Sequence, residues 1–249
     1  IEQISTAKKA MGSNSFDKVV AKALPPTGTG YNRKDADGET YVDYAQMAAD
    51  VAANYGDSNY MGGAVAEMRG GLAKGGHPAG QASFGTWLQA TSAMRRGPTE
   101  RVIDAETGKE RLETPEELRD RVNDMIIQDT IDSMPPSNLA YGKPYATKQY
   151  GKGYAKRIQQ GNQNVMETQV ALDAARQAGD TDAVAQHEAA LADHETRLTQ
   201  DIASSQGLVE ALNTAAPMNA RALANGLTSQ TIAGSGARYA GIDLGERDG

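Results

Sequence analysis

The stretch 158-IQQGNQNVMETQVALDAARQAGDTDAVAQHEAALADHETRL-198 decides the fold, because apolar residues recur along it every seven positions on both sides of a polar break. The first arm carries Ile158, Val165 and Leu172. The second arm carries a matching series: Val184, Leu191, Leu198, Ile202, Leu208 and Leu212. Residues at this period lie on one stripe of a helix. We therefore predict two long helices between Tyr150 and Ala215 that share this seam.

The break between the two arms has the composition of a tight helix–helix connection. Gly179 suits the left-handed conformation that ends a helix, and Asp180, Thr181 or Asp182 can cap the next one. So short a connection makes the arms antiparallel neighbours, and the second arm alone spans about 50 Å. The sequence therefore predicts a mainly α, elongated protein built on a long, coiled-coil-like helical hairpin.

The composition argues against a large self-sufficient core. Leu, Ile, Val and Phe number 37 of 249 residues, which is below the roughly 20 % at which packing becomes doubtful. Alanine makes up much of the apolar content, and it favours helices while burying little area. We expect partner subunits to supply part of the burial.

Charge and residue usage exclude several classes of protein. The net charge of −7 disfavours a general nucleic-acid binder. The absence of cysteine removes disulfides and thiolate chemistry, and no apolar run has the length of a transmembrane helix. The chain opens at Ile1 without an initiator Met, as a processed product or a segment of a longer protein would. The compartment stays open, with a virion or an exported location among the alternatives.

Clusters of proline and glycine divide the chain into four predicted regions. An N-terminal arm with short helices is expected over 1–39 and ends in a polar linker from Thr27. A small helical region with a glycine-rich loop follows over 40–136, beginning with a helix over Thr40–Tyr55. The helical hairpin occupies 137–216, and a C-terminal helix with a flexible tail occupies 217–249. These boundaries rest on proline and glycine clusters.

One β-hairpin and one helix start have strong local signals. Residues 101–113 place Val102 and Leu112 on either side of the turn sequence Glu106–Lys109, which predicts a two-stranded hairpin. Such a hairpin is not stable alone in water, so it must lie on helices or reach a neighbour. Directly after it, Thr114 and Glu117 flank Pro115 in the pattern of a capping box.

A basic and aromatic stretch precedes the hairpin seam. No acidic residue occurs between Ser133 and Met166. Rings and cations alternate within it: Tyr141, Lys143, Tyr145, Lys148, Tyr150, Lys152, Tyr154, Lys156 and Arg157. These side chains suit stacking on single-stranded nucleic acid, or packing of the tyrosines beneath solvated lysines. A third interpretation is docking to an acidic copy of the chain, since Glu167–Asp201 contains eight acids against two arginines.

No motif establishes a catalytic or metal site. His187 and His194 lie about two helical turns apart, roughly 10 Å, which is too far for one ion to bridge. The glycines near Gly75 lack the Lys-Ser or Lys-Thr of a phosphate loop. We expect no cofactor and no metal. Carboxylates on the region 40–94 leave one enzymatic alternative, a cell-wall glycan hydrolase using Glu67, Asp43 and Asp50, with Tyr41, Tyr44 and Tyr55 as sugar platforms.

The sequence is most consistent with a non-enzymatic structural or assembly component of a large multi-subunit machine, such as a virion or a secretion-type particle. It would act by packing helices against copies of itself or against partner proteins. The alternatives are the glycan hydrolase over 40–94 and a nucleic-acid-contacting component that uses Tyr141–Arg157.

Overall fold

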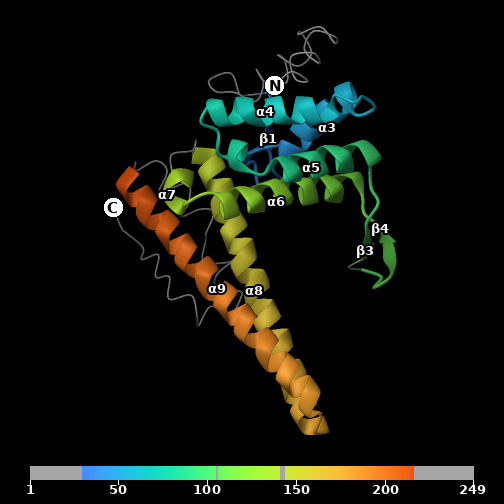
Figure 1. Ribbon diagram of the computed structural model, residues 1–249, viewed down its shortest axis with the longest axis vertical. Helices are drawn as coiled ribbons and strands as arrows, with labels where there is room; N and C mark the ends of the chain where they lie inside the picture. Colours follow the sequence, from blue (N-terminus) through green and yellow to red (C-terminus); the bar gives the residue numbers. More distant parts are fainter. Residues whose placement is uncertain (1–29, 105, 141–143, 216–249) are drawn as a thin grey trace. The chain divides into compact units, whose positions relative to one another are not determined.

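A computed structural model of the chain describes residues 30–104, 106–140 and 144–215 (Figure 1). The chain divides into two compact units, Ile1–Pro135 and Pro136–Gly249. The predicted mainly helical class is confirmed, as is the hairpin over 101–113. The N-terminal arm and its short helices, and the C-terminal helix and tail, lie outside the described residues. No helix in the described ranges has the length and apolarity needed to cross a membrane.

Unit 1 combines helices with two small antiparallel sheets. Its helices are α3 (Tyr44–Tyr55), α4 (Met61–Lys74), the 3-10 helix η1 (Pro78–Gln81), α5 (Phe84–Arg96) and α6 (Pro115–Ser133). Its strands are β1 (Asn32–Lys34), β2 (Thr40–Val42), β3 (Arg101–Ile103) and β4 (Glu110–Leu112). The helix α5 contacts α3, α4 and α6 and is therefore central to the packing of this unit.

The start of unit 1 differs from the sequence prediction in two ways. The expected linker over 27–39 contains β1, and the helix expected from Thr40 begins only at Tyr44 because Thr40–Val42 form β2. Thr, Tyr and Val are good strand formers, and Asp43 then caps α3 by accepting a hydrogen bond from Gln46 N at 2.9 Å. The glycine-rich loop expected within 40–136 likewise contains the 3-10 helix η1 at Pro78–Gln81.

The core of unit 1 combines aromatic, methionine and alanine side chains with branched aliphatics such as Val65, Leu72 and Ile126. Trp87, the only tryptophan, is fully buried and donates from Nε1 to the carbonyl of Ala79 at 3.0 Å. The ring of Tyr44 meets it edge to face, with centroids 6.2 Å apart. Aromatic side chains bury large areas and so add to the burial that the branched aliphatics provide. The expectation that partner subunits supply part of the burial stays a prediction.

Close backbone contact beneath Trp87 depends on Gly80. A Cβ added there would lie 2.2 Å from the backbone nitrogen of Ala73 and 2.6 Å from its Cα. The contact brings η1 against the end of α4, and only glycine permits that separation.

Unit 2 contains the short α7 (Pro136–Leu139) and two helices of 35 residues each, α8 (Pro144–Ala178) and α9 (Thr181–Ala215). The predicted antiparallel hairpin is confirmed, although its first arm begins before Tyr150 (Figure 1). Gly179 has φ +71°, and Asp180 accepts a hydrogen bond from Ala183 N at 3.0 Å. The turn thus uses the left-handed glycine and the aspartate cap that the sequence indicates.

The predicted seam lies inside the helical hairpin. Ile158, Leu198 and Ile202 form a buried cluster with Val165 packed against it. The remaining seam positions are buried at Leu172, Leu208 and Leu212 and half-buried at Val184 and Leu191. Gly161 allows the close approach of α9, since a Cβ there would lie 3.1 Å from a Leu198 methyl.

Candidate interaction surfaces

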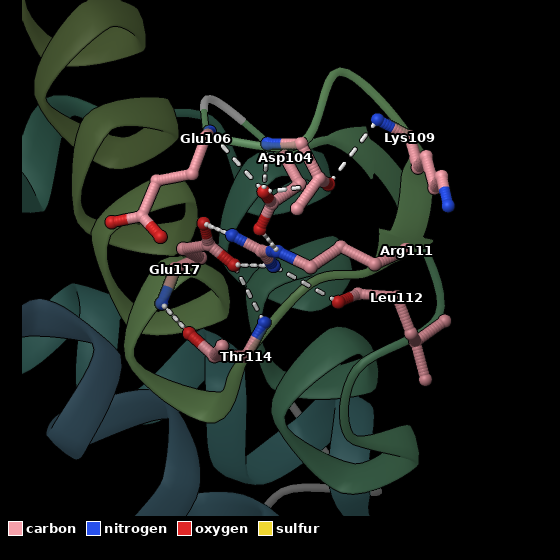
Figure 2. Close-up of polar contacts among 8 residues, drawn as sticks. Asp104, Glu106, Lys109, Arg111, Leu112, Thr114 and Glu117 are labelled. Carbon is pink, nitrogen blue, oxygen red and sulfur yellow. Dashed lines mark hydrogen bonds and ion pairs between the residues drawn. The ribbon is translucent and has the colours of Figure 1, made fainter.

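The β3–β4 ribbon is held to the start of α6 by one arginine. Arg111 donates from Nη1 and Nη2 to the two carboxylate oxygens of Glu117, at 2.7 and 2.6 Å. Its Nε donates to Asp104 at 3.1 Å. Glu117 also accepts from Thr114 N at 2.7 Å and completes the predicted capping box (Figure 2). Arg111 therefore joins the turn, the second strand and the helix start.

The carboxylates of this network are stabilised in their charged form. Hydrogen bonds from the backbone and hydroxyl of Thr107, and then from Arg111, lower the pKa of Asp104 to about 2. The Arg111 guanidinium, followed by Thr114 N–H, lowers the pKa of Glu117 to about 2. The two carboxylates in turn raise the pKa of Arg111. The network is therefore fully ionised near neutral pH.

A second ion pair fixes the base of the ribbon. Glu113 is buried and accepts hydrogen bonds from Arg121 Nε and Nη2, at 3.0 and 2.8 Å. The same carboxylate accepts from the backbone N–H groups of Thr99 and Glu100. Arg121, ahead of these two N–H groups, lowers the pKa of Glu113 to about 2. Both ends of the ribbon base are thus attached to α6.

The face of the ribbon turned away from Arg111 is exposed and carries two large aliphatic side chains beside an ion pair. Ile103 and Leu112 are 65 % and 55 % exposed, and they share this face with Arg101 and Glu110, whose charged groups are 3.5 Å apart. Figure 1 shows the ribbon extending beyond the ends of α5 and α6. Two large aliphatic side chains therefore lie uncovered on an element that is rigidly anchored.

A second exposed apolar pair lies on α8. Met166 and Val170 are 65 % and 70 % exposed, four residues apart on the helix. Val165, one residue before Met166, packs against the seam cluster. Because successive residues are about 100° apart around a helix, Met166 and Val170 lie on the outer side of the hairpin.

The predicted basic and aromatic stretch does not form one exposed surface. Tyr150 and Tyr154 are buried, as the packing interpretation expects, whereas Lys152 and Lys156 are exposed. Arg157 pairs with Asp201 of α9 at 2.5 Å. Lys148 is half-buried and Tyr145 lies in the first turn of α8. Tyr141 and Lys143 fall outside the described residues.

The carboxylates considered for glycan hydrolysis have structural contacts. Asp43 is buried, caps α3 and accepts a hydrogen bond from Arg119 at 2.6 Å. Asp50 accepts from Tyr31 Oη and Gln46 Nε2, each at 2.8 Å. Glu67 is half-buried on α4. Tyr44 and Tyr55 are buried and Tyr41 is half-buried, so two of the three suggested sugar platforms are core residues.

His187 and His194 are both half-buried on α9. No group of three or more histidine or acidic side chains that could hold a metal ion occurs within 30–104, 106–140 and 144–215. Comparison with protein-family models, with curated proteins and with solved structures finds no match to this chain.

Proposed function

We propose that this chain is a non-enzymatic structural or assembly component of a large multi-subunit machine, of the virion or secretion-particle kind. It acts by packing against copies of itself or against partner proteins. One observation carries the proposal. In the described part of the chain, four of the five large exposed hydrophobic side chains lie on the β3–β4 ribbon and on the outer side of α8: Ile103, Leu112, Met166 and Val170.

The physical argument concerns what these elements lack. A two-stranded ribbon and a two-helix hairpin each bury one side only, and both are normally completed by further strands or helices. Exposed aliphatic side chains on such elements are typical of surfaces that become covered on assembly. The anchoring of the ribbon by Arg111 and Glu113 keeps its exposed face in a fixed position before binding, which lowers the entropy cost of association.

The test is the mass of the full chain in solution across the micromolar range, measured by sedimentation equilibrium. We expect species well above the 26.3 kDa of one chain, with helicity that rises with concentration. The double variant Ile103→Ser/Leu112→Ser and the double variant Met166→Ser/Val170→Ser should each weaken association while retaining the monomer's circular dichroism. The change Phe84→Ser at the fifth exposed position is the matched control. A strictly monomeric chain would contradict the proposal.

A further inference from the structure

A second seven-residue pattern runs along α8, about 100° around the helix from the buried seam. Its members are separated by alternate steps of four and three residues, and all are exposed: Lys152, Lys156, Gln159, Gln163, Met166, Val170 and Asp173. This alternation is the contact pattern of a coiled coil. We call these seven residues the outer stripe. The helix α9 covers the seam, whereas the seven side chains of the outer stripe are exposed.

The charge along the outer stripe changes sign near its middle. Lys152 and Lys156 lie on its N-terminal half, and Asp173 lies on its C-terminal half with Glu167 at its edge. Both carboxylates are exposed and accept a hydrogen bond from the glutamine four residues earlier, Glu167 from Gln163 at 2.7 Å and Asp173 from Gln169 at 3.2 Å. Asp173 also lies 3.6 Å from the exposed guanidinium of Arg176 on the same helix.

We infer that the outer stripe is a homotypic interface, on which α8 of a second copy of this chain packs antiparallel with its two-fold axis at Gln163. This inference rests on the proposed assembly function and names its contact. In that register Lys152 faces Asp173 of the second copy, and Lys156 faces Glu167. By the residue numbers, the midpoints of these pairs lie between residues 161 and 163, both within two residues of Gln163, so one register brings both pairs within reach.

The same register accounts for the exposed apolar pair. Met166 lies across from Gln159 of the second copy, and Val170 lies across from Lys156 of that copy. The aliphatic stem of Lys156 can cover Val170 while the Lys156 ammonium reaches Glu167. The overlap from Lys152 to Asp173 is about 33 Å of helix. A parallel arrangement would instead place lysine against lysine and acid against acid, which charge repulsion disfavours.

Two charge-reversed variants test the register. The first is Lys152→Glu/Lys156→Glu and the second is Glu167→Lys/Asp173→Lys, each in the full chain. Each variant alone creates four like-charge contacts per dimer, two from each copy, so we expect the dimer Kd to rise by about tenfold or more. Mixed one to one, they restore every opposite-charge pair, so sedimentation velocity should recover a heterodimer. Association of the native chain should weaken as salt is added.

The outcomes separate this inference from the proposed function. A native chain that is monomeric throughout contradicts both. Association that persists in both variants, or that the mixture fails to rescue, overturns the outer-stripe contact and leaves assembly through another surface. Unchanged far-ultraviolet circular dichroism of each variant shows that the helices have formed.

A cross-link gives a second, independent test. The native chain has no cysteine, so Gln163→Cys introduces a single thiol at the expected two-fold axis. Mild oxidation of this variant should yield a disulfide-linked dimer. The control is Gln177→Cys, which is exposed on the same helix and should yield little dimer at the same concentration. Equal cross-linking of the two variants, or none at Gln163, would refute the register.

Discussion

At the scale of single residues, the ribbon depends on ionised carboxylates. The folded-state pKa values of Asp104, Glu113 and Glu117 are about 2, below their usual values near 4. A depressed pKa contributes stability that is present above the unfolded-state value and is lost as pH falls toward the folded-state value. We therefore expect the melting temperature of the chain to decrease between about pH 5 and pH 2.

Glu113→Gln should reduce this acid dependence, because it removes one of the three depressed carboxylates and its pairing with Arg121. At neutral pH the variant should melt at a lower temperature than the native chain, and the two curves should converge in acid. Glu106→Gln, on the exposed turn of the same ribbon, serves as the control and should follow the native curve. Thermal melts across this pH range make the measurement, and parallel curves for native chain and Glu113→Gln would contradict the assignment.

Gly80 gives a second prediction at this scale. Gly80→Ala forces the backbone of Ala73 to move, because the added Cβ would lie 2.2 Å from its nitrogen, and overpacking of this kind costs about 1–3 kcal/mol. Gly70→Ala is the matched control in α4, where a Cβ meets nothing within 4 Å, and it should stabilise by about 0.5–1 kcal/mol. Urea unfolding followed by the fluorescence of Trp87 reports both changes, and equal midpoints for the two variants would disprove the close contact.

At the scale of elements, local sequence determined most of what could be predicted. The capping box at Thr114, the two seam stripes and the turn at Gly179 are each specified by residues near one another in the chain, and the structure contains all of them. The β1–β2 pair was missed because it joins two segments of only three residues each. Its strand signal in Thr40–Val42 was masked by the helical pattern that follows from Tyr44.

The ion pairs of the ribbon could not be predicted from sequence for a different reason. Arg111 and Glu117 are six residues apart, on a strand and a helix, and nothing in a one-dimensional pattern states that they meet. The sequence also does not predict that Ile103 and Leu112 are exposed, because strands with these residues could equally have packed on a helix. The alternative that the hairpin reaches a neighbour was open in the sequence and underlies the assembly proposal.

The turn of the helical hairpin gives the prediction at this scale. Gly179→Ala places a Cβ in the left-handed region, which costs about 1–2 kcal/mol, whereas Gly179→Asn should cost less because asparagine tolerates this conformation. Thermal unfolding followed at 222 nm should therefore rank the melting temperatures native, Asn and Ala in descending order. If alanine matches the native chain, the left-handed turn is not required by the hairpin.

At the scale of the whole molecule, the composition underestimates the core of unit 1, and the assembly that it predicts stays a prediction. Unit 1 nevertheless forms a buried interior, which combines Trp87, Tyr44 and Met68 with branched aliphatics such as Val65, Leu72 and Ile126. In unit 2 the same composition has another consequence. The large aliphatic side chains of each hairpin helix lie mainly in the one seam, whereas Met166 and Val170 are exposed outside it.

This contrast predicts that the two units respond differently to concentration. Trp87 is the only tryptophan and reports unit 1, whose core is complete within one chain. Most of the helical residues of unit 2 lie in α8 and α9. Association through the outer stripe should stabilise unit 2 against unfolding by mass action. The urea midpoint followed by fluorescence should therefore stay constant as protein concentration is raised, while the midpoint followed at 222 nm increases. In the variant Lys152→Glu/Lys156→Glu both midpoints should become independent of concentration. A fluorescence midpoint that rises together with the helical one would instead mean that unit 1 also depends on its neighbours for stability.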